Sequence, residues 1–249
     1  MIVGSAIGIV LILASSVFLL GTIYRIVRYW RTPVPFKMPI APAPLTRSGV
    51  VGRMLREVFL FESLFKATRW TWLFGWVFHF SLLVVVITHL KYFTDPVWGW
   101  VVWLLPFGHY AALAMMASLA GLLIRRIVVA RVRYISAPSD YLMLLLFLAI
   151  GGSGLLMSRV FVPDILALRQ FALGLPFQLN PLPGHVLLIL HLLLVGLLLL
   201  IFPYSKLLHA PGLFFSPARN QVDDARERRH DGGWQARRQI RRQARSKNS

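Results

Sequence analysis

The chain has 249 residues, of which 57% are hydrophobic and 14% charged, a balance typical of a membrane protein with several spans. It contains no cysteine, which excludes disulfides, covalently attached c-type haem and cysteine-ligated iron–sulfur clusters within this chain. The net charge of +18 permits nucleic-acid binding until the distribution of the charges along the chain is considered.

The first predicted span covers residues 2–24, which carry no charge. A bilayer has a hydrocarbon core about 30 Å thick, and this stretch is long enough to cross it. No lysine or arginine precedes the stretch, so we expect a retained helix rather than a signal peptide. Residues 25–69 then form a basic loop, whose proline-rich first part is expected to be extended. Its second part, about 48–68, mixes apolar and basic residues, which favours an amphipathic helix in the membrane interface over a solvated loop helix.

Four further apolar stretches predict membrane helices, at about 70–90, 101–124, 141–158 and around 191–209. The third of these contains Gly151-Gly-Ser-Gly154, and such small residues allow the close approach of either a neighbouring helix or a haem. Residues 159–182 are expected to form a loop. The fold class is therefore an all-α, polytopic membrane protein, with a five-helix domain over 1–209 and a basic cytoplasmic tail over 210–249.

Lysine and arginine are strongly segregated along the chain. The loop 25–69, the turn 125–133 and the chain from 206 onwards carry all but three of them, and Lys91, Arg159 and Arg169 fall on the opposite side. The positive-inside rule then places the N-terminus outside and the C-terminus in the cytoplasm, as expected for a protein of the bacterial inner membrane. This segregation is typical of membrane topology and argues against nucleic acid as a partner.

Two of the predicted spans contain two histidines each. His79 and His89 are separated by about 15 Å of helical rise, and His191 and His209 by five helical turns. The second spacing predicts two imidazoles on one stripe of one helix. Ionisable side chains within a membrane are costly, so four histidines favour ligands of bound cofactors over histidines that bond only to neighbouring helices. Two helices with two histidines each can hold two bis-histidine haems.

At these residues the chain resembles a known family. The stretch His191 to Leu-Ile-Phe-Pro-Tyr-Ser-Lys-Leu-Leu-His209, with His79 and His89, resembles the gamma subunit of respiratory nitrate reductase, a five-helix dihaem cytochrome b. The stretch Arg56-Glu-Val-Phe-Leu-Phe-Glu-Ser-Leu-Phe-Lys66 is closer to the DsrM-like membrane subunits of Dsr (DsrMKJOP) sulfite and sulfur metabolism complexes. The tail Phe215-Ser-Pro-Ala-Arg-Asn-Gln-Val-Asp-Asp224 is similar to the same branch. The family resemblance covers most of residues 1–215.

The resemblance implies an electron-transfer subunit that does not itself act on the terminal substrate. It would carry two haems b and pass electrons between the quinone pool and a cytoplasmic, heterodisulfide-reductase-like iron–sulfur subunit. Membrane lipid, quinone and other membrane and periplasmic subunits of the complex are the further implied partners. The alternatives within this class are a nitrate reductase gamma subunit or another cytochrome b of anaerobic respiration.

The two spans that carry the histidines are expected to run antiparallel. Their depths then assign His79 and His209 to a haem on the cytoplasmic side, and His89 and His191 to a haem on the outer side. The rise between the ligands is about 15 Å on one span and about 27 Å on the other. Equal depths therefore require a tilt, a bend at Pro203, or a His209 that lies beyond the regular helix.

Basic residues near the membrane surfaces are candidates for contacts with anionic haem propionates, and each is equally suited to a snorkelling anchor. These candidates are Arg69, Arg125 and Arg126 on the cytoplasmic side and Lys91 and Arg159 on the outer side. The possible quinone region includes Lys91 and Thr88, and the family often has glycine where this chain has Thr88. His109 and His185 lie near outer ends of spans and are weaker candidates for contacts with quinone or propionate, whereas His230 falls in the tail.

Two other classes of function fit less well. A transporter needs polar residues along a path or repeats with broken helices, and the chain shows no internal repeat and few charges within its spans. A pure membrane anchor does not need four histidines within its spans. Both classes predict a protein without haem.

Overall fold

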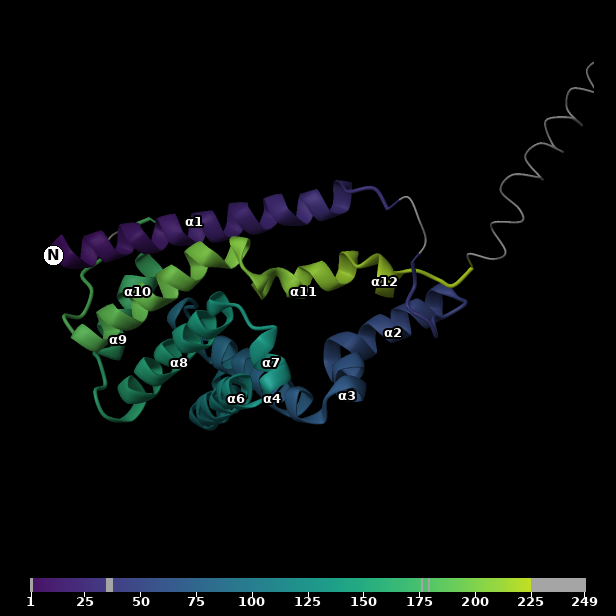
Figure 1. Cartoon of the computed structure of the whole chain (residues 1–249). Coiled ribbons are helices and arrows are strands. Elements are labelled where there is room, and N and C mark those ends of the chain that lie inside the picture. The colour runs from purple at the N-terminus through teal and green to yellow at the C-terminus, as the bar shows by residue number, and fades with distance from the viewer. Residues whose placement is uncertain (1, 35–37, 176, 179, 225–249) are drawn as a thin grey trace, which may run out of the picture. The chain divides into compact units, whose positions relative to one another are not determined.

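The computed structural model describes residues 2–34, 38–175, 177–178 and 180–224, and the regular structure over these residues is entirely helical (Figure 1). The chain divides into two compact units. The larger unit comprises residues 1–24 and 61–208, and the smaller unit comprises residues 25–60 and the chain from 209 onwards.

Within the described residues, five helical spans are long and apolar enough to cross a membrane, as the sequence predicts. Two of the spans are extended by a 3-10 turn, and one is built from two α-helices joined by such a turn. The spans are α1 (Ile2–Arg31), α4 (Arg69–His89) with a turn through Tyr92, α5 (Gly99–Leu104) with α6 (Gly108–Val128), α8 (Pro138–Arg159), and α10 (Val186–Ile201) with a turn through Tyr204.

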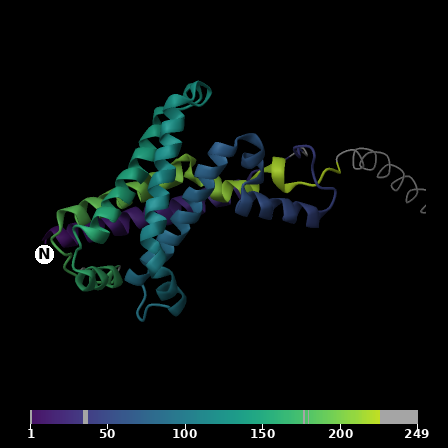
Figure 2. The same cartoon turned by 90° about the horizontal axis from the view of Figure 1, so that it is seen from below.

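The helices of the larger unit pack in chain order. Helix α4 lies along α6, α6 packs against α8, and α8 packs against α10 (Figures 1 and 2). Glycines permit these close contacts, because a Cβ atom on Gly121 would lie 2.7 Å from the ring of Phe74, and one on Gly151 would lie 2.6 Å from Met116 Sδ. Gly151 therefore serves helix packing, the first of the two roles that its motif allows.

The first part of α1 also packs within the larger unit. Its Gly21 would place a Cβ atom 2.8 Å from the ring of Pro203, and Phe18 makes an edge-to-face contact with Phe202 at 4.9 Å between centroids. Near the other end, Gly4 approaches the backbone of Leu182. This part of α1 thus runs along α10 and its 3-10 extension (Figure 1).

The stretch 159–182, which we expected to be a loop, contains the helix α9 (Ile165–Gly174). Its first turn is capped by Asp164, whose carboxylate accepts a hydrogen bond of 3.0 Å from the Ala167 N–H. Phe171 and Ala172 are buried, and α9 packs on the 3-10 turn that follows His89. The expectation of a loop was wrong. The helix is too short to give the sequence signal of a membrane span, and it is stabilised by this local cap and by burial.

The predicted amphipathic helix at 48–68 is formed by two helices, α2 (Arg47–Leu60) and α3 (Glu62–Ala67). They are separated at Phe61, whose φ of 50° is left-handed. Helix α2 belongs to the smaller unit, and α3 belongs to the larger one. A further short helix, α7 (Ala130–Tyr134), lies in the basic turn after α6.

The smaller unit joins the first loop to the start of the tail. Arg219 of α12 (Pro217–Asn220) forms an ion pair of 2.6 Å with Glu57 of α2, which is buried. Two backbone bonds of 3.0 Å reinforce this contact, from Ile40 N to Ala218 O and from Asp223 N to the carbonyl of Pro44. The remaining tail from residue 225, with His230 and most of the tail arginines, lies outside the described residues.

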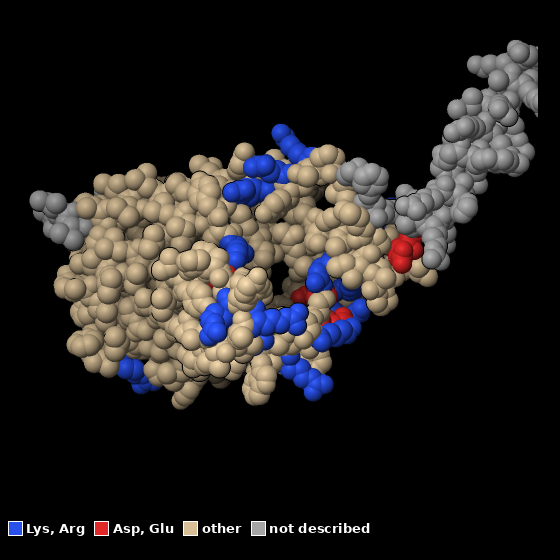
Figure 3. Space-filling view, in the orientation of Figure 1, with Lys and Arg blue, Asp and Glu red and all other residues tan. Residues whose placement is uncertain are grey.

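The surface of the larger unit is mostly apolar. Many large apolar side chains of its spans are exposed, among them Leu13, Leu83, Leu142 and Val186. The space-filling view shows a broad, mostly uncharged surface over the first part of α1 and over α9 and α10, and most of the visible lysines and arginines lie beyond it (Figure 3). Such a surface is typical of helices that face lipid.

Candidate functional site

Two histidines of α4 make the same local hydrogen bond. His79 Nδ1 lies 2.7 Å from the carbonyl oxygen of Gly75, and His89 Nδ1 lies 2.7 Å from that of Val85. A carbonyl can only accept, so Nδ1 carries the proton in both rings. The neutral imidazole then presents its lone pair on Nε2, the form in which histidine binds a metal.

His191 of α10 is held in the same tautomer by α8. Its Nδ1 lies 2.9 Å from Ser153 Oγ. A Cβ atom on Gly154 would lie 3.5 Å from the Cε1 atom of His191, so a small residue stands directly beside the imidazole. The motif Gly151-Gly-Ser-Gly154 therefore packs against α6 through its first residue and faces the histidine with its last two.

The structure brings His89 and His191 together. The two imidazoles lie within the range over which they would repel each other if both were protonated. Among the described residues, α4 packs closely against α6 and α10 packs closely against α8. Helices α4 and α10 do not pack against each other to a similar extent. Two histidines on helices that do not pack closely against each other would be able to hold one haem iron between them. The ring of His191 is half-buried and that of His89 is exposed, so both retain accessible surface.

The ring of His79 is flanked by two aromatic rings. Phe61 and Phe78 contact it edge-to-face, with centroids at 5.1 Å and 5.0 Å. Phe61 adopts the left-handed conformation, which costs a residue with a Cβ atom roughly 1–2 kcal/mol. Backbone strain of this kind concentrates at functional sites, and here it directs an aromatic ring onto a candidate ligand.

The prediction that His191 and His209 share one stripe of one helix is wrong. Helix α10 ends at Ile201, and Pro203, which has no N–H to donate, lies in the 3-10 turn that follows. Ser205 is extended, with ψ of 174°. His209 is exposed and begins the short helix α11 (His209–Gly212). Of the three ways to reconcile the depths, the structure has His209 beyond the regular helix, in the smaller unit, whereas His79 lies in the larger one.

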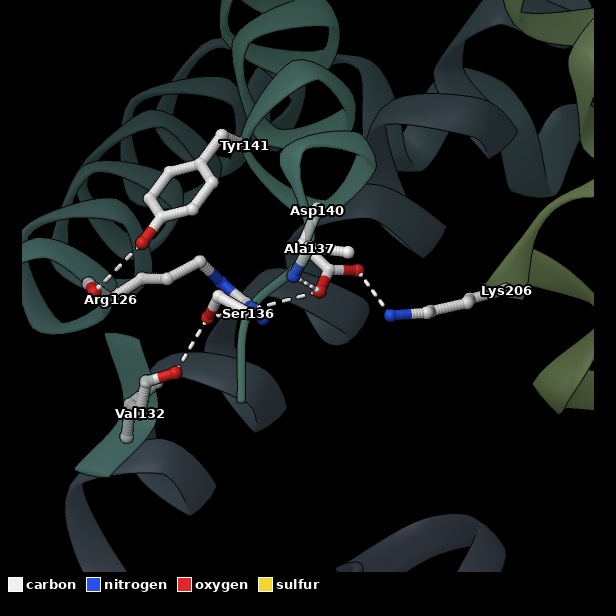
Figure 4. A network of polar contacts seen from close by, with 7 residues as sticks. All are labelled: Arg126, Val132, Ser136, Ala137, Asp140, Tyr141 and Lys206. Carbon is white, nitrogen blue, oxygen red and sulfur yellow. Dashed lines mark hydrogen bonds and ion pairs between the residues drawn. The ribbon is translucent and has the colours of Figure 1, made fainter. Parts of the chain in front are cut away.

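The segment just before His209 is fixed by a network around Asp140 (Figure 4). Lys206 Nζ lies 2.7 Å from one carboxylate oxygen of Asp140, and Arg126 Nη1 lies 3.2 Å from the other. The Asp140 carboxylate also accepts a 3.0 Å bond from Ala137 N–H, and Arg126 donates a 2.7 Å bond to Ser136 Oγ. Asp140 was not among the predicted site residues, although its position as a lone acid just before an uncharged span was the available signal.

The five candidate propionate partners have different environments. Arg126 is already engaged by Asp140, and Arg69 is exposed with its guanidinium 5.8 Å above the ring of Phe65. Lys91 is half-buried, with Nζ 4.9 Å from the ring centroid of Tyr92. The other two candidates lie near helix ends: Arg125 is half-buried and Arg159 is exposed.

Thr88 is committed to helix packing. It is buried, its hydroxyl donates a 2.8 Å bond to Val85 O, and a Cβ atom on Gly108 would lie 3.2 Å from it. This leaves Lys91 as the accessible member of the predicted quinone region.

The two histidines near the ends of spans, His109 and His185, differ in their hydrogen bonds. His109 Nδ1 bonds across to Ser158 Oγ of α8 at 3.3 Å, which is the role of a histidine that joins helices. His185 has a buried Nδ1 atom that lacks a partner within the described part of the chain.

Comparison with known proteins places this chain in a family. No protein-family model matches the chain. A protein of Archaeoglobus fulgidus is 36% identical over 272 aligned residues, which cover 89% of this chain and 81% of that protein. A protein of Archaeoglobus profundus is 34% identical, over 88% of this chain and 79% of that protein. Both are described as Hdr-like menaquinol oxidoreductase cytochrome b-like subunits.

The chain belongs to this family. The comparison confirms the prediction of a cytochrome b-like membrane subunit. Neither relative is described as a nitrate reductase subunit. These relatives therefore support the resemblance to DsrM-like subunits rather than the one to nitrate reductase gamma subunits.

Proposed function

We propose that the chain is a dihaem cytochrome b subunit that transfers electrons between menaquinol and a cytoplasmic iron–sulfur subunit. The observation that carries the proposal is that three histidines within the spans each have Nδ1 engaged in a hydrogen bond, which leaves Nε2 available to bind a metal. The names of the relatives support menaquinol as the reductant. By the resemblance to DsrM-like subunits, the complex is proposed to take part in sulfur metabolism.

His89 and His191 are proposed as the axial ligands of one haem b, and His79 and His209 as those of the other. When bound, each haem supplies one-electron redox chemistry. The chain fixes the tautomer and orientation of its imidazoles through Val85, Gly75 and Ser153, and it excludes water with apolar helices.

The end of the larger unit that holds His89 is proposed as the quinol side. Lys91 follows this histidine by two residues and offers an ammonium to a quinol oxygen or to a propionate. Arg159, at the end of α8, is a further cation for a propionate there. The asymmetry of lysine and arginine places this end outside the cytoplasm, with the N-terminus on the same side.

The smaller unit is proposed as the docking surface for the iron–sulfur partner. It contains the basic first loop and the start of the basic tail, tied together by the Glu57–Arg219 ion pair. In the chain, its first part directly precedes the segment of α3 and α4 that leads to His79, and its second part begins with His209 itself. A basic surface attracts an acidic partner and speeds its association.

A pyridine haemochrome spectrum of the purified protein, with the protein concentration measured independently, tests the proposal. We expect two haems b per chain. A preparation that retains its helical circular dichroism and lacks haem in cells supplied with a haem precursor would overturn the proposed function and favour an anchor or a transporter.

A further inference from the structure

Ser153 makes two hydrogen bonds that together fix the direction of its proton. Its Oγ atom lies 2.9 Å from Ile150 O, three residues earlier in α8, and 2.9 Å from His191 Nδ1. A hydroxyl has one proton, and a carbonyl can only accept. The Ser153 proton therefore goes to Ile150 O, and Ser153 Oγ accepts the proton of His191 Nδ1. The relay runs from the imidazole through the hydroxyl to the backbone of α8.

This relay differs from the bonds of the two candidate ligands on α4, whereas His109 and Ser158 make a similar one at the start of α6. His79 and His89 each bond to a carbonyl of their own helix, whereas His191 bonds to a neighbouring helix, through the hydroxyl of Ser153 and within reach of the Ile150 carbonyl. Ser153 is buried, with 6% of its surface exposed, so water cannot readily replace its hydroxyl. Gly154 leaves the imidazole edge beside it uncovered by a side chain.

We propose that Ser153 is a positioning residue that sets the ring orientation of His191 and lowers the redox potential of the haem that His191 binds. The inference rests on the proposed function, since it concerns a ligand of the outer haem. An acceptor at Nδ1–H makes the imidazole a stronger donor, which favours ferric over ferrous iron. The hydroxyl also stops rotation of the ring about its bond to Cβ.

The variant Ser153→Ala removes the acceptor, and Ser118→Ala is its matched control. Ser118 is a buried serine of α6 whose hydroxyl donates to Met115 O at 2.8 Å, the same local bond without a histidine. A third variant, Ser153→Thr, keeps a hydroxyl that can bond to the preceding turn. Each protein is purified with its haems, and its two midpoint potentials are measured by redox titration.

We expect Ser153→Ala to raise one midpoint potential and to leave the other unchanged. A tenfold change in the preference for ferric over ferrous iron corresponds to about 59 mV for a one-electron couple. The low-spin ferric paramagnetic resonance signal of the same haem should move, because it reports the orientation of the imidazole planes. Ser153→Thr should restore most of both properties, and Ser118→Ala should alter neither.

The result that overturns the inference is a Ser153→Ala protein whose potentials and resonance signals match those of Ser118→Ala. Selective loss of one haem in Ser153→Ala, with full retention in Ser118→Ala, supports it, and equal loss in both variants overturns it. The parent protein separates this inference from the proposed function. A parent without haem ends the proposed function, whereas a dihaem parent with an unresponsive Ser153 ends only the role of this residue.

Discussion

Replacement of Asp140 by asparagine tests how the segment before His209 is held in place. The carboxylate of Asp140 is 12% exposed and bridges Arg126 and Lys206, so the amide removes the negative charge between two cations. Lys206 is 73% exposed and recovers most of its hydration, so its pair contributes only about 0.2–1 kcal/mol. Arg126 and Ala137 N–H both bond to the other carboxylate oxygen, so an asparagine oxygen in its place keeps both bonds and loses only the charge assistance from Arg126, about 1 kcal/mol.

The expected loss is therefore about 1–2 kcal/mol at the end of the larger unit from which the chain continues to His209. Reduced-minus-oxidised spectra and a redox titration of Asp140→Asn should show a loss or shift of one haem component only. The matched control is Asp95→Asn, which removes the carboxylate of the 2.7 Å pair with Arg169 on the turn after α4. The reasoning is refuted if both variants leave the two components unchanged, or if Asp140→Asn alters the component that His191→Ala removes.

Three further predictions concern packing, docking and topology. Gly121→Ala places a Cβ atom against the ring of Phe74 and should lower the thermal stability of the purified protein, by about 1–3 kcal/mol, whereas Gly184→Ala, which meets no atom within 4 Å, should not. Truncation after Pro217 removes the ion pair and backbone bonds that close the smaller unit, so both haems should remain in the spectrum while the copurified iron–sulfur subunit is lost. Loss of haem with retained partner would reverse these roles. A reporter that is active only in the cytoplasm should be active when fused to the C-terminus, and activity of a periplasmic reporter there would overturn the topology.

The spans could be predicted because their signal is a simple physical one. A stretch of some twenty apolar residues has few structures open to it other than a membrane helix, since every backbone polar group must be paired within the segment. The histidines stood out for the same reason, as rare ionisable groups in apolar stretches. What these signals left open was the direction of each ring, which depends on hydrogen bonds such as that of His89 to Val85 O.

Features that depend on local competition or on contacts between distant residues were not predicted, apart from the position of His209 beyond the regular helix, which was one of three alternatives left open. The break after Ile201 arises because Pro203 removes a donor and Ser205 turns extended, and the apolar sequence continues through both. The partnership of Ser153 with His191 joins residues far apart in sequence, and nothing in either local stretch specifies it. The left-handed Phe61 likewise follows from the packing around it, since no glycine or asparagine marks the position.

The central claim is that four histidines bind two haems in fixed pairs, and single alanine variants of these histidines test it most directly. Redox titration followed by absorbance and paramagnetic resonance resolves the two haem components in each variant. We expect His89→Ala and His191→Ala to lose, or convert to high spin, the same component, and His79→Ala and His209→Ala to affect the other. A shared phenotype of His79→Ala and His191→Ala would contradict the pairing, and four unchanged spectra would contradict the dihaem assignment itself.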